Sequence, residues 1–288
     1  MKTGLKILFM TLAWLGCANA ELKVASLSTI TTEIAQNVGG TAVRVTPLIR
    51  PGIDPHDFQP SPWDVREIEG ANLVLLTGKG MEGYLTKLED AVGNKSKFVD
   101  VGAEIPTLTL KEDGRTVEDP HWWHSIANMK KATSVIRRHF VEADPTNKPL
   151  YATNAAAYLA KLTDLEKWVR QEIAKLPRDK RKLVTSHDAL QYFAQEYGFK
   201  IYAIEGVSTE DQPSSKKVTD LINKIREQEV KAVFFESIKN PKVTTEITKE
   251  TGAKTGGELF VDGLGEKEAS TYPDMIRHNI QTIVENLK

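Results

Sequence analysis

The sequence holds one cysteine in 288 residues, and this residue, Cys17, lies within an N-terminal segment that has the pattern of an export signal. A mature chain without that segment has no thiol for a disulfide or for a thiolate metal site. Long apolar runs are also missing, because the longest, Ile7 to Gly16, is about half of the roughly 20 residues that span a bilayer. The formal net charge is −1, without a basic cluster. These absences argue against a membrane-spanning protein and against nucleic acid as a main partner.

The first 20 residues predict secretion. Lys2 and Lys6 give a positive start, an apolar run follows, and Ala18-Asn19-Ala20 supplies the small residues of a cleavage site. We therefore expect residues 1–20 to be a signal peptide that is cleaved after Ala20. The expected location of the mature chain is the periplasm, where it would be soluble.

Short β-rich runs, each followed by a helix-like stretch, recur along the rest of the chain. Strands that alternate with helices predict an α/β fold with parallel sheets built from βα units. About 268 mature residues are enough for two lobes of ordinary size. The expected strands are Leu22–Leu27, Val43–Ile49, Ala71–Leu76 and Phe98–Val101 in the first lobe, then Lys182–Thr185, Lys200–Ile204, Lys231–Phe235 and Leu259–Val261 in the second.

Between the two sets of strands, Pro145 to Leu176 is rich in Ala, Leu, Lys and Glu, and Pro177 marks its end. Its larger apolar residues recur three, four or seven apart, which places them on one helix face. We expect one long, rigid helix over residues 145–176 that joins an N-terminal lobe, 21–144, to a C-terminal lobe, 177–288. An ordinary helix inside one lobe is the alternative.

Two of the six histidines occur in the same tripeptide, Asp54-Pro55-His56 and Asp119-Pro120-His121. Proline fixes its own φ and restricts the residue before it, so each histidine leaves a stiff turn in a defined direction. His187 follows an expected strand, and Asp262 follows another within a glycine-containing turn. The carboxyl ends of strands in open α/β sheets are where ligands bind.

These four residues, His56, His121, His187 and Asp262, come two from each expected lobe, so their site would lie in the cleft between the lobes. Three imidazoles and one carboxylate suit tetrahedral zinc (Zn2+), whereas calcium and magnesium prefer oxygen ligands. Any one histidine alone is more often an ordinary surface or hydrogen-bonded residue. The repeated tripeptide and the two strand-end positions together favour a metal site.

We expect other polar residues to lie around this site and to orient its ligands or line the path to it. His124 lies beside His121 and either orients a ligand or lines the access path. Four carboxylates are candidates to orient the imidazoles, although each also has an ordinary structural or solvated interpretation. They are Asp57, Asp188, Glu205 and Glu236.

Four sequence pieces resemble the metal-ligand motifs of the zinc and manganese solute-binding proteins of ABC importers, a TroA-like superfamily. They are residues 55–61 (PHDFQPS), 119–123 (DPHWW), 185–190 (TSHDAL) and 260–265 (FVDGLG), in order and across the mature chain. The resemblance implies two βα lobes joined by a backbone helix, and carries the ligand role onto His56, His121, His187 and Asp262. It also implies a membrane permease and a cytoplasmic ATPase as partners.

Within that family a histidine in the third motif usually accompanies zinc and a glutamate manganese, so His187 implies zinc as the transported ion. The segment Glu104 to Glu118 is short and has no histidine, unlike the long His-rich loop of many zinc members. A separate periplasmic protein could then supply the metal. The ending Trp122-Trp123-His124-Ser125 looks most like the AztC-type zinc-binding proteins.

Three rival functions remain at this stage. Manganese or iron uptake is the alternative within the family. A periplasmic zinc hydrolase would need an open coordination position, and no helix carries His-Glu-x-x-His. An adhesin or metal-sensing surface protein on the same scaffold is the third; lipid attachment at Cys17 would favour it, but Trp14 stands where a small aliphatic residue is usual. We expect a monomer with no catalytic residues.

Overall fold

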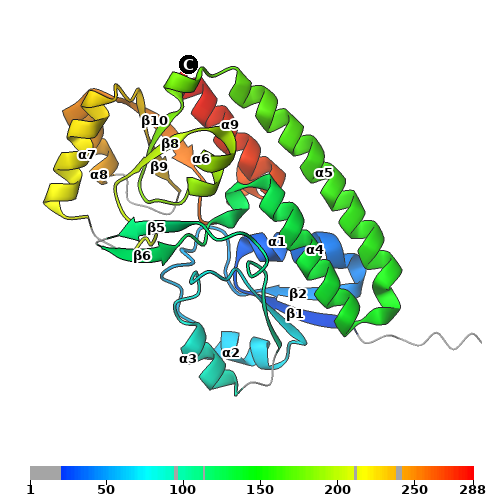
Figure 1. Cartoon of the computed structure of the whole chain (residues 1–288). Helices are drawn as coiled ribbons and strands as arrows, with labels where there is room; N and C mark the ends of the chain where they lie inside the picture. Colours follow the sequence, from blue (N-terminus) through cyan, green and yellow to red (C-terminus); the bar gives the residue numbers. More distant parts are fainter. Residues whose placement is uncertain (1–20, 94–96, 113, 211–212, 238–241) are drawn as a thin grey trace, which may run out of the picture.

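The computed structural model describes residues 21–93, 97–112, 114–210, 213–237 and 242–288. They form two lobes, each with a parallel sheet covered by helices (Figure 1). The predicted signal peptide and Cys17 lie outside the described residues. No helix in the described ranges has the length and apolar character that a membrane crossing requires.

The N-terminal sheet has the order β2-β1-β3-β4 and the C-terminal sheet the order β10-β9-β7-β8. Every pairing within both sheets is parallel, as the alternation of strands and helices predicted. The strands are β1 (Leu22–Ser26), β2 (Val43–Pro47), β3 (Leu73–Leu76), β4 (Lys97–Asp100), β7 (Lys182–Thr185), β8 (Lys200–Ala203), β9 (Ala232–Glu236) and β10 (Lys254–Leu259).

The helices that cover the sheets are amphipathic, and several begin at a side-chain cap. Ser61, for example, forms a capping box with Asp64 at the start of α2. The helices are α1 (Thr29–Gly39), α2 (Pro62–Glu69), α3 (Leu85–Val92), α4 (Ile126–Ala143), α5 (Lys148–Ala174), α6 (Gln191–Tyr197), α7 (Ser215–Glu227), α8 (Lys242–Thr251) and α9 (Tyr272–Leu287). Short 3-10 turns lie at Gly40–Ala42, Trp122–His124, Pro145–Asn147, Arg178–Lys180 and Lys267–Ala269.

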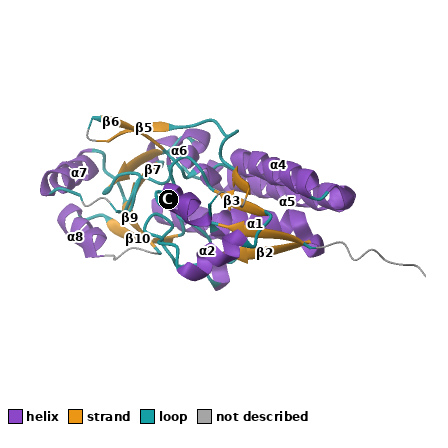
Figure 2. Ribbon diagram, turned by 90° about the horizontal axis from the view of Figure 1, so that it is seen from below, coloured by secondary structure: helices purple, strands orange, loops and turns teal. Residues whose placement is uncertain are grey.

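The long central helix is present as predicted. A 3-10 turn at Pro145–Asn147 leads into α5, whose 27 residues extend about 40 Å along the edge of the molecule (Figure 1). Its buried stripe packs against α1 and α4 of the first lobe and against α9 of the second. Figure 2 shows α4 and α5 side by side. The stripe consists of Tyr151, Ala155, Tyr158, Leu162, Leu165, Val169 and Ile173.

One large hydrophobic cluster runs through both lobes. It includes Val24 of β1, Leu162 of α5 and Phe234 of β9, all fully or nearly fully buried. A shared core restricts how far two lobes can move apart, because separating them would expose apolar surface to water. The exact lobe boundaries that we predicted stay a prediction.

Two elements differ from the sequence-based expectation. The segment before the second tripeptide, which we expected to be a short loop, forms an antiparallel hairpin of β5 (Thr109–Glu112) and β6 (Arg115–Glu118). Each strand has a single apolar residue, the half-buried Leu110 and Val117, so the sequence shows no clear apolar alternation. Strand β10 covers Lys254–Leu259 instead of Leu259–Val261. Gly256 and Gly257 interrupt its apolar pattern, and the pairing with β9 shifts register there.

Candidate metal site

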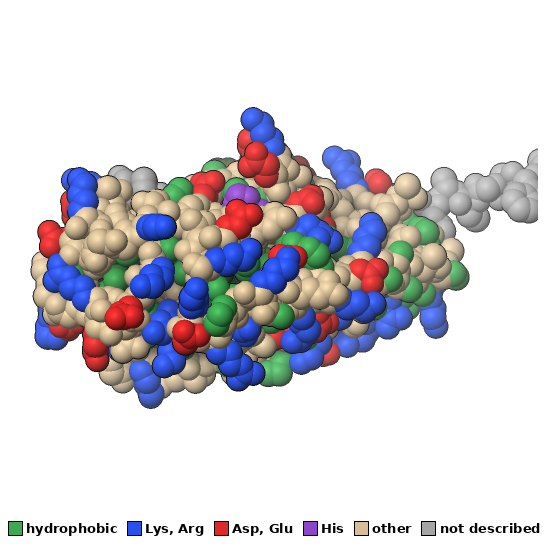
Figure 3. Space-filling model, turned by 90° about the horizontal axis from the view of Figure 1, so that it is seen from above, with side chains coloured by type: hydrophobic (Ala, Val, Ile, Leu, Met, Phe, Trp, Pro, Cys, Tyr) green, Lys and Arg blue, Asp and Glu red, His purple; other side chains and the backbone are tan. Residues whose placement is uncertain are grey.

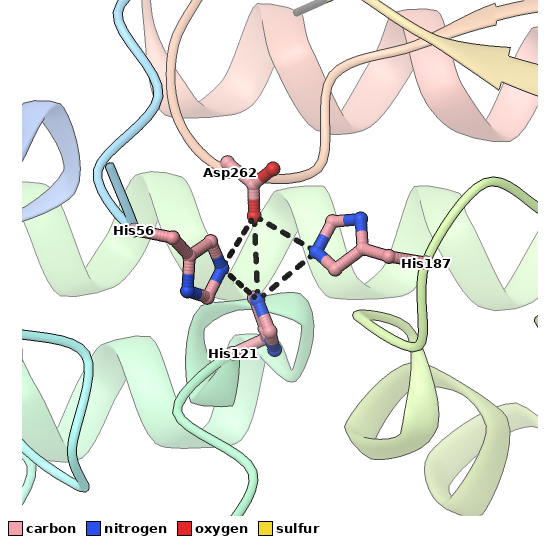
Figure 4. A group of neighbouring side chains, drawn as sticks. All are labelled: His56, His121, His187 and Asp262. Carbon is pink, nitrogen blue, oxygen red and sulfur yellow. Dashed lines mark hydrogen bonds and ion pairs between the residues drawn. The ribbon is translucent and has the colours of Figure 1, made fainter. Parts of the chain in front are cut away.

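The structure brings His56, His121, His187 and Asp262 together between the lobes (Figure 4). One ligand atom from each lies within 4.8 Å of the others. The Nε2 atom of His121 is 3.2 Å from Nε2 of His56 and 3.3 Å from Nε2 of His187. Oδ1 of Asp262 lies 3.5, 3.3 and 3.2 Å from Nε2 of His56, His121 and His187 respectively.

These separations match a metal coordination shell. Four donors at zinc bond lengths of about 2.0–2.1 Å, in a tetrahedron, lie about 3.3 Å from one another. Five of the six separations between the donors run from 3.2 to 3.5 Å. The sixth separation, between the donors of His56 and His187, lies within 4.8 Å, so the four donors converge on one centre that a single ion can occupy.

The two Asp-Pro-His turns place their histidines as predicted, and the aspartates have a role that the sequence analysis missed. Oδ1 of Asp54 accepts a hydrogen bond from the backbone N–H of His56 at 2.9 Å. Oδ1 of Asp119 accepts from the backbone N–H of His121 at 2.9 Å and also contacts its ring Nδ1 at 2.8 Å. The signal was present in the sequence, because an aspartate commonly accepts from the backbone two residues later.

His187 is fixed by a carboxylate from the neighbouring strand. It follows β7, and Glu236 ends β9, so the two meet at the carboxyl edge of the sheet. Glu236 contacts the His187 backbone N–H at 2.9 Å and Nδ1 at 2.6 Å, and both side chains are fully buried. This contact directs Nε2 toward the centre of the site.

Among the four predicted orienting carboxylates, Glu236 thus contacts a ligand ring. Asp57 is exposed, and Asp188 instead accepts a hydrogen bond from the Gln191 amide at 2.8 Å. Glu205 is placed by its backbone N–H, which donates to the Ser186 carbonyl.

Asp262 is held by a set of contacts that joins the lobes behind the site. The carbonyl of Val261 accepts from Nε1 of Trp123 at 3.0 Å and contacts Nε2 of His124 at 2.8 Å. His124 is buried and lies against this carbonyl, so it positions the Asp262 segment and does not line an access path. Burial lowers the pKa of His124 to about 4, which leaves a neutral ring that can donate to the carbonyl.

The turn after Asp262 needs its glycine. The backbone N–H of Leu264 donates to Oγ1 of Thr29 at 2.8 Å, which brings the turn against α1 of the other lobe. A Cβ on Gly263 would lie 2.5 Å from that same oxygen, closer than van der Waals contact permits. A glycine at this position therefore allows the turn to approach α1 closely.

The charges of the site keep Asp262 ionised and raise the pKa of two of the histidines. Burial alone would lower the pKa of His121, but hydrogen bonds to Asp119 and Asp262 outweigh it and raise that pKa above 6.5. Burial is likewise outweighed at His187, where Asp262 and Glu236 hold the pKa well above 6.5. Burial would raise the pKa of Asp262, but the surrounding histidines hold it well below 3.8. Asp262 therefore stays ionised, as a metal ligand must be.

The four residues differ in how far they are exposed. The side chain of His56 is 6% exposed, whereas those of His121, His187 and Asp262 are 0 to 2% exposed. His56 also lines two cavities, of about 550 and 380 Å³, that share Gly83 and Glu210. Figure 3 shows a small histidine surface beside a projecting knob of charged side chains.

Comparison with known proteins agrees with this architecture. The family model described as the periplasmic component A of the zinc-uptake complex matches residues 24–286. The manganese-binding lipoprotein MntA of Bacillus subtilis is 36% identical, with all of both chains covered. The iron-binding protein YfeA of Yersinia pestis is 35% identical and covers 92% of this chain and 86% of its own.

Two solved structures have the same fold along nearly the whole chain. The periplasmic zinc-binding protein TroA of Treponema pallidum has a TM-score of 0.88 at 28% identity and covers 93% of this chain and 99% of its own. The manganese-bound periplasmic metal-binding protein of Candidatus Liberibacter asiaticus has a TM-score of 0.85 at 30% identity, with 93% and 100% covered.

Proposed function

Because this chain belongs to the family of metal-binding solute-binding proteins of ABC importers, we propose that it captures one zinc ion and delivers it to a membrane permease. The observation that carries the proposal is the convergence of four donor atoms, from both lobes, within 4.8 Å of one another. His56, His121, His187 and Asp262 would be the ligands. Their burial replaces water around the ion, which strengthens its attraction to the donors.

The choice of zinc is based on the donors and their spacing. Three imidazole nitrogens and one carboxylate oxygen form a four-donor set of the kind that zinc prefers. Four protein donors also complete a tetrahedral shell, so a hydrolase would lack the open position for its metal-bound water. We propose a carrier with no catalytic role.

Manganese or iron uptake is the second candidate, and the relatives favour it. MntA of Bacillus subtilis is described as manganese-binding and YfeA of Yersinia pestis as iron-binding. TroA of Treponema pallidum, by contrast, is described as zinc-binding. The resemblance to AztC-type zinc-binding proteins is based only on Trp122-Trp123-His124-Ser125, at the end of the second motif. The relatives described above do not support this subtype.

A competition between metals tests the assignment. Purified mature protein is stripped with a chelator, reloaded with an equimolar mixture of zinc, manganese and iron(II) under anaerobic conditions, and assayed by plasma mass spectrometry. We expect about one zinc per chain, because the tetrahedral donor set follows the order of affinities that places zinc above manganese and iron(II). Preferential retention of manganese would reject the zinc assignment and leave metal capture intact. Retention of no metal would reject both.

The partners and the location follow from the same proposal. A permease and its cytoplasmic ATPase would receive the metal, and the chain would act as a monomer outside the cytoplasm. Several relatives are described as lipoproteins, so the N-terminus has two candidate forms. Intact mass of the exported protein distinguishes cleavage after Ala20 from lipid attachment at Cys17. Loading by a periplasmic donor protein remains a hypothesis.

Metal affinity should fall as the pH falls. In the metal-free protein, neighbouring carboxylates raise the pKa of His121 and of His187, so these imidazoles hold protons above pH 6.5. The metal must displace those protons, so affinity should rise with pH and level off only above the raised pKa values. We expect roughly a tenfold loss per pH unit for each displaced proton, measured by chelator competition. Constant affinity from about pH 7.5 to about pH 5 would exclude imidazole ligation.

A further inference from the structure

The two Asp-Pro-His turns use their aspartates differently. Asp119 is fully buried, and its Oδ1 contacts both the backbone and the ring of His121. Asp54 uses Oδ1 for the backbone N–H of His56 and Oδ2 for another partner, the hydroxyl of Thr209, at 2.6 Å. Thr209 lies 155 residues further along the chain, in the loop that follows β8 of the other lobe. The first turn is thus tied across the cleft.

His56 is the least anchored of the four ligands. Carboxylates contact Nδ1 of both His121 and His187, and two donors converge on the carbonyl before Asp262. Within the residues that the structure describes, no hydrogen bond to Nδ1 of His56 is recorded. Its ring also lines the two cavities that open to solvent. Movement of the His56 loop therefore exposes the site at the lowest structural cost.

The Thr209 loop is a firm point of attachment. Thr209 is buried, with 5% of its surface exposed. Two residues before it, the backbone N–H of Val207 donates to the carboxylate of Glu112 in the β5–β6 hairpin. Glu112, Val207 and His56 line the same cavity, so the hairpin supports the loop at the rim of the access path.

We propose that the Asp54–Thr209 hydrogen bond is a latch that holds the His56 loop over the metal and sets the rate of metal release. The proposal depends on metal capture at this site. Thr209 is a positioning residue that acts through Asp54. Because the acceptor is a carboxylate, this hydrogen bond is of the stronger, charge-assisted kind. Without it the loop opens more often, while the remaining three ligands stay in place.

The test compares two substitutions at one position. Thr209→Val keeps the branched shape and removes the hydroxyl, whereas Thr209→Ser keeps the hydroxyl and serves as the matched control. Each protein is stripped, loaded with one equivalent of zinc, and mixed with excess chelator in a stopped-flow instrument. We expect Thr209→Val to release zinc about tenfold faster, with unchanged stoichiometry and a melting temperature of the metal-free form that falls by only a few degrees. Thr209→Ser should release zinc at close to the wild-type rate.

The outcomes separate the latch from the proposed function. Wild-type protein that takes up zinc, with Thr209→Val releasing it at the same rate, overturns the latch alone. Equal acceleration in Thr209→Val and Thr209→Ser also overturns it, because the hydroxyl would then not be responsible. Wild-type protein that takes up no metal overturns the proposed function as well. If Thr209→Val does not fold, Thr209→Ala removes the same hydroxyl with a smaller side chain and should also accelerate release about tenfold.

Discussion

Replacing His187 with alanine is expected to weaken zinc binding by more than about a hundredfold, because even the loss of a residue that orients a metal-bound histidine costs about 10–100-fold. The substitution removes one of four donors and leaves a void beside Asp262. It also removes the ring nitrogen that contacts Oε2 of Glu236, so this fully buried carboxylate oxygen loses its partner. Zinc affinity is measured by competition with a chromophoric chelator, and metal content after dialysis gives an independent readout.

The matched control for this substitution is His278→Ala. His278 lies on α9 in the same lobe, and its Nε2 contacts the backbone carbonyl of Glu258 and none of the four donors. It should bind zinc like the wild type. Wild-type affinity in His187→Ala, or equal losses in the two variants, would contradict the ligand role of His187.

Zinc is expected to raise the free energy of unfolding by about 4 kcal/mol when free zinc is about 1,000 times the dissociation constant. For a chain of this size that corresponds to an increase in melting temperature of about 8–16 °C. The cause is that the folded chain holds the four donors together, whereas the unfolded chain does not. Differential scanning calorimetry with and without zinc measures the change.

Magnesium at the same concentration provides the ion control, because it prefers oxygen ligands and should produce little change. His187→Ala should lose most of the zinc-dependent increase. A wild-type melting temperature that does not respond to zinc would count against a site assembled from both lobes.

The sequence predicted the parts of the molecule that are encoded locally. The stripe of α5 was visible because apolar residues repeat with helical spacing and no glycine interrupts them. His56 and His121 were found because proline stiffens their turns, and His187 and Asp262 because each follows an expected strand. The structure places these four residues together, and their ligand role stays a prediction.

Contacts between distant residues could not be predicted in the same way. Thr209 looks like an ordinary loop residue, and only the fold brings it to Asp54. The contact between Nε2 of His124 and the backbone carbonyl of Val261 joins residues 137 positions apart. The strands of the β5–β6 hairpin are rich in charged and polar side chains. They form through backbone pairing, and the sequence has no apolar pattern from which they could be predicted.

The continuous core has a consequence for cooperativity and for engineering. Since α5 packs against α1, α4 and α9 at once, neither half of the chain can bury its own apolar face when the other is removed. Each half expressed alone would expose a stripe of tyrosine and leucine side chains to solvent and tend to aggregate. Exchange of whole lobes between relatives would disrupt the same surface. A change of metal preference is therefore better sought in the loops around the four donors, where substitutions leave the common core intact.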